Sequence, residues 1–272
     1  MPTAYINNHN MYYEIHGKGE PVLCMGGWGS YCHGNHYHLA KGLIDKYKVI
    51  IFDHRGLGKS NDNEKIVPSM KLYANDAIKL IDFLNLPKVH LIGLVGMGAC
   101  IAQEIAIIKP KIVKSMINMN TWARVDDLLR HQLEMLRDVH REMGWKSFQK
   151  LVCLWSFEEN FYLENQNRIL GVEGPWRELN GKYKAHERLI EACINHNTLD
   201  RLHNIKCPTL IIHCPKDTVN GPRLTNVLEK GISGARGHTI EGAAHVIAGK
   251  EMRKKFSALV LEFLDEVNDS KE

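Results

Sequence analysis

The sequence has no C-x-x-C motif, no large excess of one charge and no long apolar run. Its seven cysteines are scattered and odd in number, which argues against a disulfide framework or a zinc site and favours free thiols in a reducing cytosol. The net charge of +4 comes from interspersed charges, so no nucleic-acid partner is expected. Because no stretch of about 18 apolar residues occurs and the first residues do not resemble a signal peptide, we expect no membrane partner and a cytoplasmic location.

Apolar runs alternate with helical patterns through the first 120 residues. Alternation of this kind predicts an α/β fold, with a mostly parallel central sheet covered by helices on both faces. The expected strands are residues 3–6, 11–16, 22–25, 48–52, 89–92 and 113–119, with residues 7–10 as the turn of a leading hairpin. The expected helices are residues 36–44, 72–84 and 99–108.

The pattern changes after residue 121. Helices are expected at residues 126–144, 145–157 and 186–202, with no strand among them, before the sheet resumes at 208–214 and 237–240 and a helix closes the chain at 256–267. We therefore predict a core formed by residues 1–121 and 204–272, and a helical cap formed by residues 122–203. A cap inserted over the carboxyl ends of the strands would cover a ligand site.

Four segments carry a resemblance to a known family. In chain order they are MGGWGS (25–30), FDHRGLGKSN (52–61), CPTLIIHCPKDTV (207–219) and IEGAAHVI (240–247). In these segments and their order, the chain resembles the capped α/β-hydrolases across essentially its whole length. The resemblance implies that Asp217 and His245 are catalytic, because the family order is nucleophile elbow, acid, histidine.

The same resemblance implies an oxyanion hole and a pocket. Backbone N–H groups of the loop after the third strand and of the residue after the elbow apex would stabilise a negatively charged oxygen; these residues are Gly27, Trp28 and Met97. The pocket is expected to be lined by Trp122, Trp155, Phe157 and His33. Phe161 and Trp176 are expected either to line it or to pack in the core of the cap.

The elbow segment LIGLVGMGACIAQE (91–104) departs from the family pattern G-x-S-x-G. Alignment from the left places Val95 at the nucleophile position, and alignment from the right places Gly96 there, so the turn carries an apparent insertion. Neither residue can attack a carbonyl. Cys100 lies about one turn into the following helix, where we expect a packed core thiol.

Other polar residues have simpler interpretations. In the family turn, Asp53 and Arg55 are expected to brace loops. His33, His36 and His38 cannot all point inward from one helix, and no carboxylate follows at a matching spacing. We therefore expect no metal and no cofactor.

Two classes of function remain open. The first is an enzyme acting on a small apolar carbonyl- or ester-bearing molecule, in which an Asp-supported His activates water or transfers a proton in a lyase, cyclase or C–C cleavage reaction. The second is a non-catalytic relative that binds a small ligand or a protein partner in the pocket that corresponds to the family's active site. The retained Asp217 and His245 favour the first class, and the missing hydroxyl favours the second. A monomer or a homodimer is expected.

Overall fold

The computed structural model describes residues 2–27, 33, 36 and 39–270. Its centre is an eight-stranded sheet of order β1-β2-β4-β3-β5-β6-β7-β8. The strands are β1 (Thr3–Ile6), β2 (His9–His16), β3 (Pro21–Met25), β4 (Lys48–Phe52), β5 (Val89–Gly93), β6 (Val113–Met119), β7 (Thr209–His213) and β8 (Arg236–Thr239). The pairs β1–β2 and β2–β4 are antiparallel and all other pairs are parallel. The predicted mostly parallel central sheet is confirmed.

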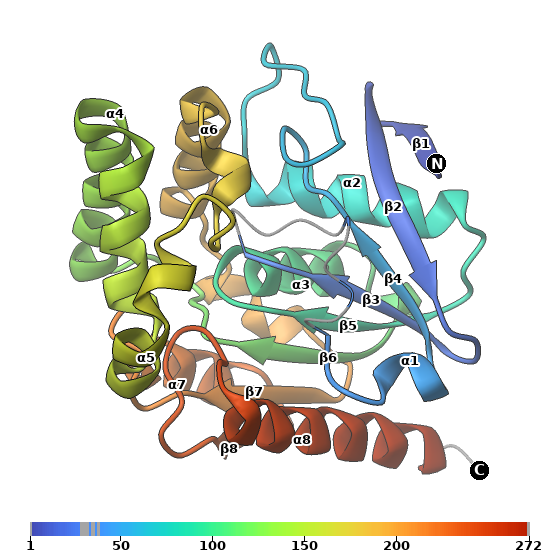
Figure 1. The fold of residues 1–272 in the computed structure, drawn as a ribbon. Coiled ribbons are helices and arrows are strands. Elements are labelled where there is room, and N and C mark those ends of the chain that lie inside the picture. Colours follow the sequence, from blue (N-terminus) through green and yellow to red (C-terminus); the bar gives the residue numbers. More distant parts are fainter. Residues whose placement is uncertain (1, 28–32, 34–35, 37–38, 271–272) are drawn as a thin grey trace.

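Helices cover both faces of this sheet (Figure 1). They are α1 (Leu43–Lys46), α2 (Met70–Phe83), α3 (Met97–Ile108), α4 (Asp127–Ser156), α5 (Glu159–Ile169), α6 (Tyr183–Ile194), α7 (Pro222–Gly231) and α8 (Lys250–Asp269), with short 3₁₀ turns η2 (Pro110–Ile112), η3 (Arg177–Leu179) and η4 (Leu199–Asn204). One apolar cluster joins α2, α3 and α7 to one face of the sheet, and a second joins α1 and α8 to the other face. The central strands β3, β5 and β7 are buried along their whole length, as parallel strands covered on both faces must be.

Helices α4, α5 and α6 lie together in the chain between β6 and β7 (Figure 1). We call residues 120–208 the helical segment. Among its residues the only β contact is an isolated bridge between Arg124 and Asn197. Helix α4 contains a break at Gly144, where φ is 76° and ψ is 177°, so two helices meet end to end at the predicted point. The segment is not separated from the sheet, because Leu129, Phe148 and Ile190 belong to the same apolar cluster as α2 and α3.

The structure corrects several predicted boundaries. The leading hairpin turns at Asn7 and Asn8 alone, both with positive φ, because two residues of this kind complete the tight turn that suits twisted strands. The helix expected at 36–44 begins only at Leu43, after Gly42 at φ 89°. Helices α5 and α7 were not predicted. The sequence of α5 has no clear apolar face, and α7 begins with Pro222, whose missing N–H is tolerated at the first helical position.

Candidate active site

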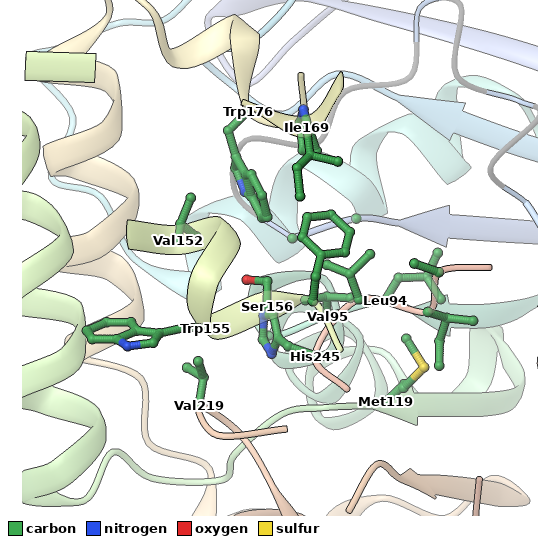
Figure 2. A pocket seen from close by; sticks show the side chains of 18 of the residues that line it. Leu94, Val95, Met119, Val152, Trp155, Ser156, Ile169, Trp176, Val219 and His245 are labelled. Atoms are coloured by element: carbon green, nitrogen blue, oxygen red, sulfur yellow. The ribbon is translucent and has the colours of Figure 1, made fainter. Parts of the chain in front are cut away.

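A cavity of about 730 Å³ opens at the carboxyl ends of the central strands, beneath the helical segment. The loops after β3, β5 and β6 form its floor, and α4, α5 and the η3 region form its roof (Figure 2). From the loops that follow the strands its lining includes Gly27, Leu94, Val95, Gly96, Trp122, Asn220 and His245. From the helical segment it includes Val152, Trp155, Ser156, Phe157, Phe161 and Trp176. Carboxyl ends of parallel strands are the usual place for a ligand site in such sheets.

His245 and Asp217 form a hydrogen-bonded pair at this cavity. His245 Nδ1 lies 2.9 Å from Asp217 Oδ2, and the carboxylate side chain is fully buried. Asp217 Oδ1 accepts backbone hydrogen bonds from Val219 N at 2.8 Å and Asn220 N at 2.9 Å. These bonds fix the carboxylate, which in turn holds the imidazole in the tautomer protonated at Nδ1. His245 lines the cavity, so its second nitrogen, Nε2, remains for a substrate or a water.

Asn120 connects the loops that form the floor. It directly follows β6 and has a positive φ of 50°, which Asn tolerates better than most residues. Its carbonyl oxygen accepts from Gly96 N at 2.6 Å and from Asn220 Nδ2 at 3.1 Å. Its side-chain Nδ2 donates to His245 O at 2.9 Å. One residue thus ties the turn after β5, the loop of Asp217 and the loop of His245 to each other.

The turn after β5 has an unusual backbone. Val95 and Gly96 both have positive φ, at 48° and 61°, and α3 begins at the next residue, Met97. A β-branched residue at positive φ is a true outlier and costs of order 1–3 kcal/mol. The strand, the sharp turn and the helix have the layout of a nucleophile elbow, but the side chains at its apex are an isopropyl group and a hydrogen atom.

Space at the apex is limited. A Cβ atom on Gly96 would lie 3.2 Å from Trp122 Cζ3 and 3.4 Å from Asn220 Nδ2, so a side chain there would press on both residues. On the other side, a Cβ on Gly27 would lie 2.6 Å from the carbonyl oxygen of Val95. The loop after β3 can therefore approach the elbow this closely only because residue 27 is glycine.

Cys100 does not replace the missing hydroxyl. The residue is fully buried within α3, and its Sγ lies 3.3 Å from Thr121 Oγ1. Burial raises the pKa of this thiol to about 12, and a thiol that stays protonated is a poor nucleophile. It is absent from the described residues that line the cavity.

The remaining predicted site residues fall into three groups. Trp122, Trp155 and Phe157 line the cavity, as do Phe161 and Trp176. Met97 is the first residue of α3, so its N–H belongs to the helix turn that lacks intrahelical acceptors. Trp28 lies outside the described residues.

His33 bonds to the turn after β4. Its Nδ1 lies 2.9 Å from Asp53 Oδ2 and its Nε2 lies 3.7 Å from Glu178 Oε1 in the helical segment. It is not among the described lining residues, and its partner Asp53 is the first residue of the turn after β4. The same turn holds Arg55, which makes a buried two-bond contact with Asp76 at 2.7 and 3.0 Å. Asp53 and Arg55 thus brace loops in this structure.

His33 and His36 do not converge on one point. His36 stacks on His16 with ring centroids 4.7 Å apart, whereas His33 faces Asp53. The candidate ligand atoms of Glu14, His16 and His36 lie within 4.8 Å of one another near the surface, a grouping that sequence spacing did not indicate. His38 lies outside the described residues.

The cavity, the Asp217–His245 pair and the elbow lie in a part of the chain that matches a known family. The family model described as "Serine aminopeptidase, S33" matches residues 22–251. The chain belongs to this family of α/β-hydrolases. The matched range includes the elbow, Asp217 and His245. No helix among the described residues is long and apolar enough to cross a membrane.

Related proteins agree with this assignment along the chain. A protein of Azorhizobium caulinodans named "Putative carbamate hydrolase RutD" is 27% identical over 98% of this chain and 100% of its own length. An enol-lactonase from Burkholderia xenovorans has the same fold, with a TM-score of 0.84 at 20% identity over 97% of this chain and 100% of its own. An α/β-hydrolase enzyme from a Medee basin deep-sea metagenome library reaches a TM-score of 0.85 at 20% identity over 97% of both chains.

Three polar residues of this family member were missed by sequence reasoning. Asn120 and Asn220 lie under the elbow, and Ser156 lies on the roof of the cavity. The signal for Asn120 was its place directly after a buried strand of the sheet. Asn220 follows Asp217 by three residues in the same loop. Nothing in the sequence marked Ser156, because its position depends on where α4 ends.

Proposed function

We propose that this chain hydrolyses a small apolar ester or a related carbonyl compound without a serine nucleophile. In this reaction the Asp217-supported His245 activates a water molecule, and backbone N–H groups of the floor stabilise the oxyanion. The observation that carries the proposal is the His245–Asp217 pair on a cavity of substrate size, beside an elbow with no hydroxyl or accessible thiol at its apex. No cofactor is needed for this chemistry.

The roles of the residues follow from the geometry. Water attacks the carbonyl carbon and gives its proton to His245 Nε2, while Asp217 holds the imidazole by Nδ1 and stabilises its protonated form. The proton then passes to the leaving group. Gly27 N and Met97 N are our candidate oxyanion donors, with Trp28 N as a third from the resemblance alone; one such donor is worth about 3 kcal/mol in the transition state. The same pair could move a proton to or from carbon, which keeps lyase, cyclase or C–C cleavage chemistry as a related possibility.

The lining favours an apolar substrate. Aromatic and aliphatic side chains dominate the cavity wall, including Trp122, Trp155 and Phe157. Related proteins named for carbamate hydrolysis and enol-lactone hydrolysis also suggest a small carbonyl compound. Among the described lining residues, four are cationic and one is acidic, namely Arg168, Arg177, Lys250, Arg253 and Glu173. A neutral or anionic polar end of the substrate would suit them better than a cationic one.

The helical segment is proposed to act as a cap. Its residues Val152, Trp155 and Phe157 form part of the cavity wall, so its removal would expose an apolar surface. We take residues 122–203 as the cap and residues 1–121 and 204–272 as the core. If a core in which 122–200 is replaced by a short linker stayed monodisperse and kept its ligand affinity, the cap would have no role at the site.

Hydrolysis of p-nitrophenyl butyrate, a small apolar ester, tests the proposal. The wild-type chain should release nitrophenol with multiple turnovers, and His245→Ala should not do so above background. Treatment with a fluorophosphonate serine probe should leave residues 93–100 unmodified by mass spectrometry. Unchanged turnover in His245→Ala would refute the proposal. Tight binding of the ester or its products with no turnover in wild type would instead favour a ligand-binding protein.

A further inference from the structure

A serine on the cavity roof has an unsatisfied hydroxyl. Ser156 is the last residue of α4, is fully buried and lines the cavity. Within the described part of the chain its Oγ has no hydrogen-bond partner. Leaving a buried hydroxyl unpaired costs about 1–3 kcal/mol, and such groups in native proteins usually meet an ordered water or a ligand. Ser156 therefore points to a polar atom that occupies the cavity when the protein is in water.

Ser156 and His245 belong to the same part of the wall. The backbone N of Val246, the residue after His245, donates to Ser156 O at 2.8 Å, and both Ser156 and His245 line the cavity (Figure 2). His245 Nδ1 is occupied by Asp217, so Nε2 is the nitrogen that serves the cavity. Nearby Asn220 adds a second buried oxygen, Oδ1, that has no partner among the described residues. A bound water needs two to four such polar partners.

We propose that Ser156 is a further catalytic residue, whose Oγ holds the attacking water together with His245 Nε2. This inference rests on the proposed function. The water donates one hydrogen bond to His245 Nε2 and one to Ser156 Oγ, which directs an oxygen lone pair at the substrate carbonyl. Such placement removes much of the entropic cost of the attack. The elbow has no hydroxyl, and the helical segment supplies one instead. This hydroxyl binds the attacking water and does not attack the substrate.

The step balances without any further reagent. The water oxygen forms a bond to the carbonyl carbon, its proton moves to His245 Nε2, and the π electrons move to the carbonyl oxygen at the backbone N–H groups. Collapse of this intermediate breaks the bond to the leaving alkoxide, which takes the proton from His245. The products are the acid and the alcohol, and Ser156 is unchanged.

The geometry disfavours Ser156 as a nucleophile. An attacking serine is usually hydrogen-bonded to its base, at about 2.6–3.2 Å, and Ser156 Oγ makes no such bond to His245 among the described residues. Both groups line the cavity, and a water that bridges them would give the Ser156 hydroxyl the partner that it lacks among the described residues.

The test compares Ser156→Ala, Ser156→Thr and a control, Ser147→Ala, on the same helix and not among the described lining residues. With p-nitrophenyl butyrate, Ser156→Ala should lower kcat about 10–100-fold, in line with the loss of placement of one reactant, and should change KM less than about twofold. Ser156→Thr keeps a hydroxyl and should recover part of kcat, and Ser147→Ala should match wild type. Because the alanine removes the hydroxyl together with its bound water and leaves no buried polar group without a partner, the Tm of Ser156→Ala should stay close to that of wild type.

A crystal structure supplies a readout that needs no substrate. An ordered water should lie at 2.6–3.2 Å from both Ser156 Oγ and His245 Nε2 and should vanish or move in Ser156→Ala. Absence of this water in wild type would overturn the proposal, and so would a fluorophosphonate adduct on Ser156, which would make it a nucleophile. Wild-type kcat in Ser156→Ala with an inactive His245→Ala would refute the role of Ser156 and leave the proposed function intact. A lowered Tm in Ser156→Ala, with activity recovered at low temperature, would show a structural role instead.

Discussion

Two Asp–His pairs in this molecule have the same local geometry. In each, Nδ1 of the histidine lies 2.9 Å from Oδ2 of the aspartate, and in each the aspartate side chain has no exposed surface. His245 of the first pair lines the cavity, whereas neither residue of the other pair, His33–Asp53, is among the described lining residues. The second nitrogen of His33 faces Glu178 at 3.7 Å, whereas that of His245 faces the cavity.

This difference in surroundings shows that a hydrogen bond between histidine and aspartate is not enough to make a catalytic site. An imidazole held by a carboxylate can either move a proton or tie two parts of a fold together, and the partner of its other nitrogen decides which. For His33 that partner is a side chain of the helical segment, so the pair connects the core to that segment. For His245 that partner is whatever enters the cavity. Substitutions in the two pairs should therefore change different quantities.

His245→Ala is expected to have the largest effect. It should lower turnover of p-nitrophenyl butyrate by about 10²–10⁴-fold, the range for a positioned acid–base group. Affinity for the substrate should change far less, because binding comes mainly from the apolar wall and the backbone amides. The measurement is kcat and KM of purified variant and wild type, with circular dichroism to verify folding. A variant with full turnover would make the two pairs equivalent and remove the basis of the comparison.

Asp217→Asn should have the next largest effect. Its side chain can no longer accept the Nδ1–H bond with a carboxylate oxygen, so the imidazole is no longer held in its productive tautomer. Turnover should fall by about 10²-fold, at the lower end of the same range, since His245 itself remains. Steady-state kinetics of Asp217→Asn and of the double variant with His245→Ala provide the check. If the two losses multiplied in the double variant, Asp217 would act independently of His245.

His33→Ala should affect stability and leave turnover alone. It removes the ring between Asp53 and Glu178 and leaves a buried carboxylate with one fewer donor. Since Lys59 N still donates to Asp53 at 2.7 Å, we expect a loss of about 1–3 kcal/mol in the free energy of unfolding and a kcat within about twofold of wild type. Urea unfolding followed by fluorescence, together with the same ester assay, measures both. A large loss of kcat in a stably folded His33→Ala would instead place His33 at the site.

The sequence located the fold and the His245–Asp217 pair for physical reasons. Strands β4 and β6 are largely buried and rich in apolar residues, and both matched their predicted bounds. Asp217 follows the fully buried strand β7, whereas His245 follows the exposed strand β8 and was placed by the family order of segments. By contrast, the site residues Asn120 and Ser156 depend on positive φ and on the end of a long helix, which are set by tertiary packing.

The two alignments of the elbow, which place Val95 or Gly96 at the nucleophile position, could be judged only from the structure. Val95 and Gly96 both adopt positive φ, so each of the two alignments named a residue of the sharp turn. Only the positions of Trp122 and Asn220 show that the space beside Gly96 is restricted. Likewise, His33 could not be separated from the cavity by its sequence neighbours, because its partners Asp53 and Glu178 lie 20 and 145 residues away along the chain.

A third pair consists of two histidines and contains no carboxylate. It should have the smallest effect of the three pairs, and that effect should be on the pH dependence of stability. In the helical segment, Nδ1 of His140 and Nδ1 of His186 lie 2.9 Å apart and both rings are buried. Burial lowers the pKa of His140, and burial together with the neighbouring His140 lowers the pKa of His186 well below 6.5. The unfolded chain therefore binds protons first as the pH falls below about 6.5, so stability is present above that pH and is lost on acidification.

We accordingly expect the Tm of the wild-type chain to fall by about 2–4 °C per kcal/mol lost between pH 7.5 and pH 5.5. In His186→Gln, which cannot take up a proton and keeps a polar partner for His140, the decrease should be smaller. Differential scanning calorimetry of both chains across this range measures it, and the difference between the two curves removes the contributions of all other groups. Parallel curves would show that this pair, unlike the two pairs with carboxylates, contributes nothing to the response of the fold to pH.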